Sequence, residues 1–220
     1  LLDNEYLKHL LSVKYFVETS PVQDMPLISQ YSGKTGTFYV YENTKALPIG
    51  YTYNAYITQE EFIQLPVEKR QLVLCQALVI HEKDVSQLHG MTVLTKQQIE
   101  DLSESQANME LEKRRNESSS NFYRDQKGFS ADIQSDSDKM AFFSVTYDTG
   151  WSATVNGRDV PVLNSNGMMA VPVSEGENHI EFTYRVPWAA AGFYITLASA
   201  GSWCIYVFIM YRIRKVRSAV

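Results

Sequence analysis

The feature that most constrains the fold of this chain is an uncharged run near its carboxyl end. From Val186 to Tyr211 there is no Asp, Glu, Lys, Arg or His. About twenty apolar residues suffice for a helix to cross the hydrocarbon core of a bilayer. The sequence therefore predicts one transmembrane helix over residues 188–211, in contact with membrane lipid.

Positive charge follows this run directly. Four cations lie within six residues, with no acidic residue among them: Arg212, Arg214, Lys215 and Arg217. Lys and Arg are enriched on the cytoplasmic flank of membrane helices. We therefore expect residues 212–220 to be a basic cytoplasmic tail and residues 1–187 to be extracytoplasmic.

The expected extracytoplasmic part is acidic. Without the four tail cations, Lys plus Arg falls from 20 to 16 while Asp plus Glu stays at 25, which leaves a net charge of −9. Such a surface is a poor partner for polyanions, so nucleic acid is excluded. The 45% hydrophobic content also excludes a disordered chain. Cys75 lies outside the predicted span and Cys204 within it, so no intradomain disulfide is expected, which suits a bacterial cell surface.

The amino end carries neither an initiator Met nor the pattern of a signal peptide. A domain outside the cell needs an export signal, and upstream membrane spans supply one. We therefore expect a fragment of a multi-pass protein of the bacterial cell membrane, whose upstream spans pack against the last helix.

Residues 1–103 are predicted to form a mixed α/β subdomain. Strand patterns alternate with helices, two of which begin at the capping residues Thr58 and Thr95. The next stretch, 104–121, is polar and has little to bury, so it is expected to be a linker with a frayed helix over its charged part.

Residues 122–187 show the strongest β pattern. Apolar residues alternate with polar ones in five successive segments, the last around Ile180 and Phe182. Asn156-Gly157 is a preferred pair for a two-residue hairpin turn. These residues predict an antiparallel meander that forms half of a sandwich. The expected fold class is α+β, mainly β, with one transmembrane helix at the carboxyl end.

Recognisable catalytic motifs are absent from the sequence, and the four histidines are scattered. The polar stretch around His81 and His89 is interpreted as solvated rather than metal-binding, and no metal or cofactor is expected in this fragment. The remaining candidate is the turn that carries Tyr147, Asp148 and Trp151, because exposed rings beside a carboxylate can bind sugars. In the alternative interpretation, Trp151 fills the sandwich core.

Several phrases, in order, resemble the carboxy-terminal region of the bacterial YfhO-type membrane proteins. They are residues 11–17 (LSVKYFV), 40–43 (VYEN), 46–48 (ALP), 147–151 (YDTGW), 155–157 (VNG), 170–173 (AVPV), 176–178 (GEN) and 182–185 (FTYR). They lie along most of the chain and end on a final membrane helix with a basic tail.

The resemblance implies a polytopic protein of Gram-positive-type bacteria, similar to GT-C glycosyltransferases. Such enzymes transfer a sugar from an undecaprenyl-phosphate carrier to cell-envelope polymers such as lipoteichoic acid. The catalytic carboxylate of that class lies in an early outer loop, so we expect no catalytic residue in this fragment, and its domain would cover the active site or hold the teichoic-acid acceptor. A non-catalytic structural or carbohydrate-binding ectodomain, or part of a membrane transporter, stays open as an alternative.

Overall fold

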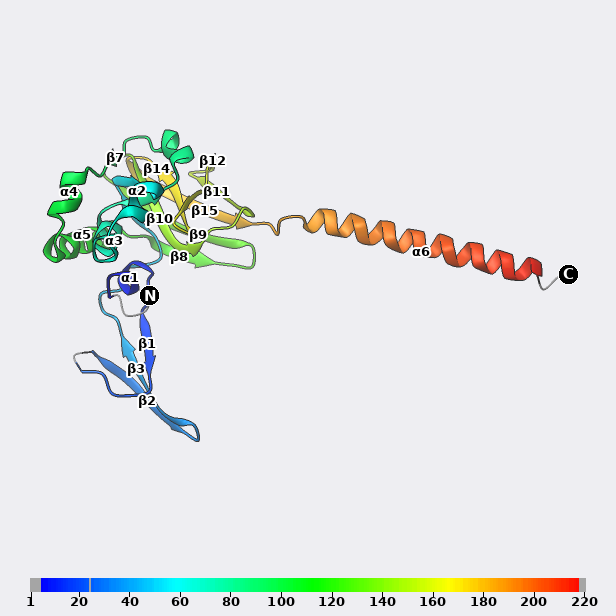
Figure 1. Cartoon of the computed structure of the whole chain (residues 1–220), viewed down its shortest axis with the longest axis horizontal. Coiled ribbons are helices and arrows are strands. Elements are labelled where there is room, and N and C mark those ends of the chain that lie inside the picture. Colours follow the sequence, from blue (N-terminus) through cyan, green and yellow to red (C-terminus); the bar gives the residue numbers. More distant parts are fainter. Residues whose placement is uncertain (1–4, 24, 218–220) are drawn as a thin grey trace. The chain divides into compact units, whose positions relative to one another are not determined.

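The computed structural model of the chain describes residues 5–23 and 25–217. It divides into two units, Leu1–Tyr184 and Arg185–Val220 (Figure 1). The fold is mainly β with several helices and a long final helix, which confirms the predicted fold class.

The strands of the first unit are β1 (Tyr15–Glu18), β2 (Leu27–Gly33), β3 (Gly36–Glu42), β4 (Tyr51–Tyr53), β5 (Ala55–Thr58), β6 (Leu78–Ile80), β7 (Thr92–Val93), β8 (Ser120–Arg124), β9 (Gly128–Ser135), β10 (Lys139–Thr146), β11 (Trp151–Val155), β12 (Arg158–Val160), β13 (Leu163–Ser165), β14 (Met168–Val173) and β15 (Gly176–Tyr184). Its helices are α1 (Glu5–Leu10), α2 (Gln59–Gln64), α3 (Val67–Gln76), the 3-10 helix η1 (Glu82–Gln87), α4 (Lys96–Asp101) and α5 (Glu104–Asn116).

Two antiparallel sheets form a β-sandwich. One has the strand order β13-β14-β10-β4 and the other the order β12-β11-β15-β9-β8. Between them lies an apolar core that includes the fully buried Phe143, Met169 and Ile180. The predicted meander is therefore wrong in one respect, because successive strands pass back and forth between the two sheets and complete a whole sandwich.

A second apolar core covers the other face of the four-stranded sheet. There Met140 and Phe142 pack with residues of the helices and of the three-stranded sheet β6-β5-β7. The four-stranded sheet is thus buried on both faces, which explains why β10 is buried along most of its length.

The local signals at turns and helix starts are confirmed. Asn156 and Gly157 both have positive φ angles, 51° and 74°, and connect the paired strands β11 and β12. Thr58 caps α2 and Thr95 caps α4, each by accepting a hydrogen bond from a backbone N–H of the first turn.

The segment expected to be a polar linker is instead mostly helix α5. Ser103 begins it with a capping box, and Ala107, Leu111 and Arg114 are buried on one side. β4 lies before this segment in the chain but pairs with β10 after it. The sequence-based boundary at 104–121 therefore does not divide the first unit, whose two halves share a sheet and a core.

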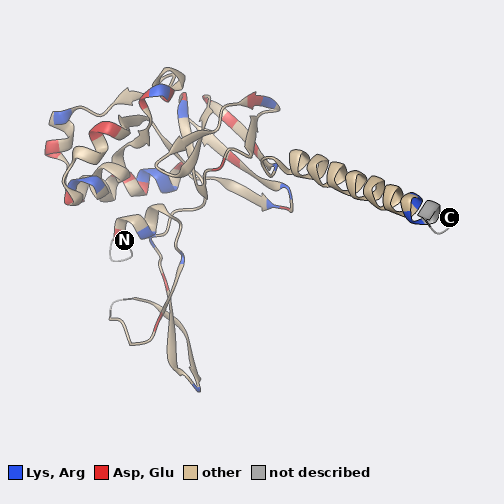
Figure 2. Ribbon diagram, turned by 45° about the vertical axis from the view of Figure 1, so that its right-hand side comes forward, with Lys and Arg blue, Asp and Glu red and all other residues tan. Residues whose placement is uncertain are grey.

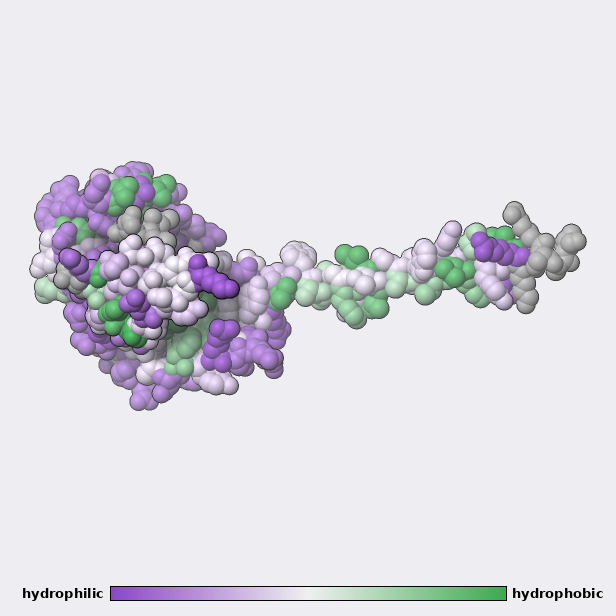
Figure 3. All heavy atoms as spheres, turned by 90° about the horizontal axis from the view of Figure 1, so that it is seen from below, coloured by the Kyte–Doolittle hydropathy of each residue, from purple (hydrophilic) through white to green (hydrophobic). Residues whose placement is uncertain are grey.

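The second unit contains α6 (Ala189–Arg217), in which a candidate membrane span covers Ala189–Arg214. Figure 3 shows its surface as green or pale along most of its length, and Figure 2 shows basic residues in blue near its carboxyl end. The hydroxyl groups of Thr196, Ser199 and Ser202 each donate to the carbonyl four residues earlier, at 2.9 Å. These bonds satisfy the polar groups within the helix, as a bilayer requires. The helix continues into the expected tail, of which residues 218–220 lie outside the described part.

Candidate functional site

The aromatic turn joins β10 to β11 and is anchored by Asp148. Its Oδ1 accepts hydrogen bonds from the backbone N–H of Gly150 at 2.7 Å and from the hydroxyl of Tyr184 at 3.1 Å. The ring of Trp151 is half-buried, with its centroid 5.0 Å from that of Tyr184. Tyr147 is half-buried as well, and both rings pack against the sandwich core. Only Asp148 of the three candidate residues is exposed, so the turn offers little aromatic surface to a sugar.

A second surface, which we call the polar face, is the outer side of the five-stranded sheet. The register of the strands aligns one row of side chains across all five: Asp159, Thr154, Glu181, Ser130 and Tyr123. A neighbouring row consists of His179, Asp132 and Ser120. The residues in these rows are polar, and Tyr123, which is 67% exposed, also contributes an aromatic ring. The face thus combines hydroxyls, carboxylates, an imidazole and one accessible aromatic ring.

His179 is the centre of a hydrogen-bonded group on this face. Its Nδ1 lies 2.6 Å from Oδ1 of Asp132, and its Nε2 lies 3.7 Å from Oε1 of Glu181. Asn121 donates from Nδ2 to the other oxygen of Asp132 at 2.8 Å. Asn156 accepts from the backbone N–H of His179, also at 2.8 Å. The carboxylate of Asp132 therefore orients the imidazole ring, and Asn156 holds the backbone of His179.

Asp132 and His179 each shift the pKa of the other in the direction that favours the charged form. The hydrogen bond that His179 donates to the Asp132 carboxylate raises the pKa of His179 above its ordinary value. Hydrogen bonds from Asn121 and His179 lower the pKa of Asp132. The imidazolium form of His179 therefore persists to a higher pH than in an ordinary histidine, and the ion pair with Asp132 is lost as the pH rises through the raised pKa of His179.

We expect the Asp132→Asn substitution to lower the pKa of His179 toward the ordinary value of histidine, because the anionic partner is removed. An NMR titration of the imidazole signals measures this directly. Glu181→Gln is the control, since Glu181 lies farther from the ring and its removal should shift the pKa less. Equal shifts in the two variants would contradict the assignment of Asp132 as the main partner.

Beside His179 the polar face is hollowed. The hollow has a volume of about 540 Å³ and is lined mostly by polar residues, which include Asn121, Asp132, Asn156, Glu177 and His179. Its donors and acceptors are spread over several strands, a pattern that can bind the hydroxyl groups of a saccharide or polyol. Among the described residues, no group of three or more His, Cys, Asp or Glu side chains is placed to hold a metal ion.

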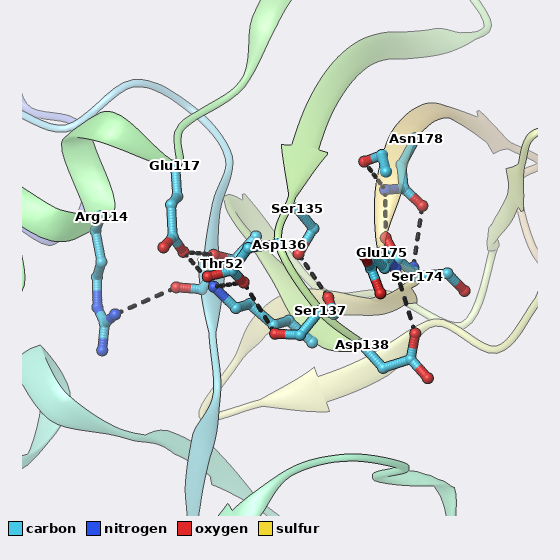
Figure 4. Close-up of polar contacts among 12 residues, drawn as sticks. Thr52, Arg114, Glu117, Ser135, Asp136, Ser137, Asp138, Ser174, Glu175 and Asn178 are labelled. Carbon is cyan, nitrogen blue, oxygen red and sulfur yellow. Dashed lines mark hydrogen bonds and ion pairs between the residues drawn. The ribbon is translucent and has the colours of Figure 1, made fainter.

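Buried charges lie elsewhere, at the contact of α5 with β4. The guanidinium of Arg114, 2% exposed, donates to the carbonyl oxygens of Thr52 and Gln76 and lies 3.9 Å from the ring centroid of Tyr53. Figure 4 shows Arg114 directed at the β4 strand. These contacts are internal, so they hold α5 in place rather than face a ligand.

Lys139, 3% exposed, completes this buried group. Its Nζ lies 2.8 Å from Oε2 of Glu117 and 2.6 Å from Oδ1 of Asp136. Burial alone would raise the pKa of Glu117, but hydrogen bonds from Lys139 and Thr52 lower it. The glutamate is therefore ionised and ties the end of α5 to β10 and β4 (Figure 4).

A β-sandwich unit joined to one apolar helix long enough to span a bilayer defines a membrane-attached domain. Residues 94–196 match the family model described as the bacterial membrane protein YfhO. The matched part runs from the connection before α4 through strands β8 to β15 into α6, so it includes every strand of the sandwich except β4. It confirms the resemblance of this region to the YfhO-type membrane proteins. Comparisons with curated proteins and with solved structures found no match.

Sequence reasoning missed the group around His179. The alternation on either side of Ile180 placed His179 and Glu181 on the outward side of a strand, and this signal was available. Their neighbour Asp132 lies 47 residues away in sequence and meets His179 only through the register of β9 with β15. The alternation could have revealed the outward face, but the residues alone could not reveal the pair.

Proposed function

We propose that the chain is the extracytoplasmic domain and last membrane span of a polytopic bacterial glycosyltransferase. The enzyme takes a sugar from an undecaprenyl-phosphate carrier and attaches it to an envelope polymer such as lipoteichoic acid. The YfhO match over residues 94–196 and the membrane helix support this class of protein. The basic residues after the span favour a cytoplasmic carboxyl end, which leaves the sandwich outside the cell.

Within this proposal, the sandwich binds the acceptor polymer on its polar face. The observation that carries this step is the oriented group of Asp132, His179 and Glu181 beside a hollow of about 540 Å³. Carboxylates and amides accept and donate hydrogen bonds to polyol hydroxyls, and the exposed ring of Tyr123 can stack on a sugar. The imidazole adds a further hydrogen-bonding group to this face.

A binding titration tests the acceptor site. The whole chain in lipid nanodiscs is titrated with teichoic-acid fragments, and the dissociation constant is compared with that of a Tyr123→Ala, His179→Ala double variant. Loss of a stacked ring and a hydrogen bond is expected to weaken binding about tenfold. Lys83→Ala, on the separate helix η1, is the control and should bind as the unaltered chain does.

The aromatic turn is the alternative binding surface. A Tyr147→Ala, Trp151→Ala double variant is titrated in the same way after circular dichroism has shown that it is folded. If only this variant loses affinity, the acceptor contacts the turn, and the assignment to the polar face is wrong.

A structural ectodomain without a ligand is the second candidate function. The half-burial of Tyr147 and Trp151 favours it for the turn, because their rings contribute to the sandwich core. In that case no saccharide or polyol-phosphate fragment binds, and none of these variants differs from the unaltered chain in the titration.

A further inference from the structure

The strands β1, β3 and β2 form a separate three-stranded sheet, which we call the arm. β3 is central and pairs with both neighbours. Figure 1 shows the arm extending away from the helices and sheets of the remainder of the first unit. Every residue of β2 is exposed. The arm therefore cannot rely on the core of the sandwich to cover its apolar residues.

The two faces of the arm differ. On one face Tyr41 is only 2% exposed, and its hydroxyl accepts a hydrogen bond from the backbone N–H of Val22 at 2.8 Å. The connection between β1 and β2 thus contacts this face.

The register places another set of residues together on the opposite, open face: Tyr15, Val17, Tyr31, Phe38 and Val40. Tyr15, Val17 and Tyr31 are 52%, 62% and 67% exposed. Clustered exposed apolar residues mark interaction surfaces. We therefore expect the open face to bind a partner.

The chemistry of the open face matches the boundary between lipid headgroups and acyl chains. It carries three aromatic rings, and two of them are tyrosines with a polar hydroxyl at the tip. Such amphipathic rings concentrate at membrane interfaces. Figure 3 views the arm from its end and shows it as mostly pale, between hydrophilic and hydrophobic.

The charges of the arm are compatible with an anionic bilayer. The sequence outside the membrane helix and tail carries a net charge of −9, yet the only carboxylate in the rows of the open face is Glu42. Its Oε1 lies 3.8 Å from Nζ of Lys14. Lys34 lies at the turn between β2 and β3. This face therefore carries little of the negative charge of the domain, and an anionic surface repels it weakly.

The chain also keeps the bilayer within reach of the first unit. Only residues 185–188 separate β15 from α6, and four residues span at most about 14 Å. A short tether of this kind raises the effective concentration of the membrane at the domain, so weak apolar contacts suffice.

We propose that the open face of the arm binds the membrane interface, with Tyr15, Val17 and Tyr31 at the level of the lipid headgroups. The arm then acts as a second, reversible membrane contact besides α6. This inference does not depend on glycosyl transfer or on the polar face.

An environment-sensitive fluorophore on the arm tests the contact. The whole chain carries Cys204→Ala, so that the buried Cys75 is the one native thiol left, and Val17→Cys is labelled with NBD. The protein is reconstituted into vesicles that contain about 30% phosphatidylglycerol, with or without lipids that carry a spin label near the headgroup. We expect a blue-shifted emission and quenching by the labelled lipid about twofold or more above the control.

The matched control is Gln30→Cys, an exposed residue of the same sheet whose row, with Tyr39 and Glu18, lies on the other face. Both sites are exposed, so neither substitution removes a buried side chain. Circular dichroism verifies that each labelled protein is folded.

Three outcomes would overturn the proposal. A blue shift at residue 17 without quenching by lipid shows that protein covers the open face instead. The absence of both signals shows that the face stays in water. Equal quenching at residues 17 and 30 shows that proximity to the vesicle, rather than binding by the open face, causes the signal.

Discussion

Replacing Arg114 with alanine is expected to lower the free energy of unfolding of the first unit by about 3 kcal/mol. The substitution removes a side chain that is 2% exposed and leaves a cavity beside the ring of Tyr53. It also leaves the carbonyl oxygens of Thr52 and Gln76 without their buried donor. Both effects act on the contact that holds α5 against β4.

Chemical unfolding in detergent, followed by near-ultraviolet circular dichroism, measures this change in the packed aromatic residues. Lys113→Ala is the matched control, because Lys113 is the preceding residue of the same helix and is exposed. Its effect should stay within about 0.5 kcal/mol. A loss at Arg114 no larger than at Lys113 would show that α5 is not tied to the sheet by this side chain.

Arg114 also explains why the sequence failed to predict α5 as a packed helix. Ala107, Leu111 and Arg114 follow the spacing of one helix face, but the third position of the apolar stripe is occupied by a charged residue. Composition alone therefore indicates a solvated linker. The capping pair Ser103 and Gln106 was the local signal that could have marked its start.

The membrane helix, the hairpin turn at Asn156-Gly157 and the helix starts at Thr58 and Thr95 were predictable because each depends on neighbouring residues. The place of β4 was not, because Tyr51–Tyr53 pairs with residues 140–142, almost ninety positions later. The pairing of Asp132 with His179 could not be predicted for the same reason, because the two residues lie far apart in the sequence. Short-range patterns indicate which side of a strand is buried, but they do not specify which strand lies beside it.

Gly128→Ala is expected to lower the free energy of unfolding by about 3 kcal/mol, because the added methyl meets backbone. A Cβ atom at residue 128 would lie 1.9 Å from the carbonyl oxygen of Phe182 on the paired strand β15. No rotation of a side chain can relieve that contact, so β9 and β15 must separate locally. The same unfolding experiment measures the loss.

Gly33→Ala in the arm is the matched control. Its Cβ would lie 2.9 Å from the ring of Tyr31, which is exposed and can turn away, so the cost should stay below about 1 kcal/mol.

The separation of β9 from β15 in the Gly128→Ala variant has a second expected effect, because Asp132 and His179 face each other across the same two strands. If the strands part as far as that pair, the pKa of His179 falls toward its ordinary value together with the stability. A destabilised variant with an unchanged His179 pKa would show that the strain stays at the strand end and that the polar face is held independently of it.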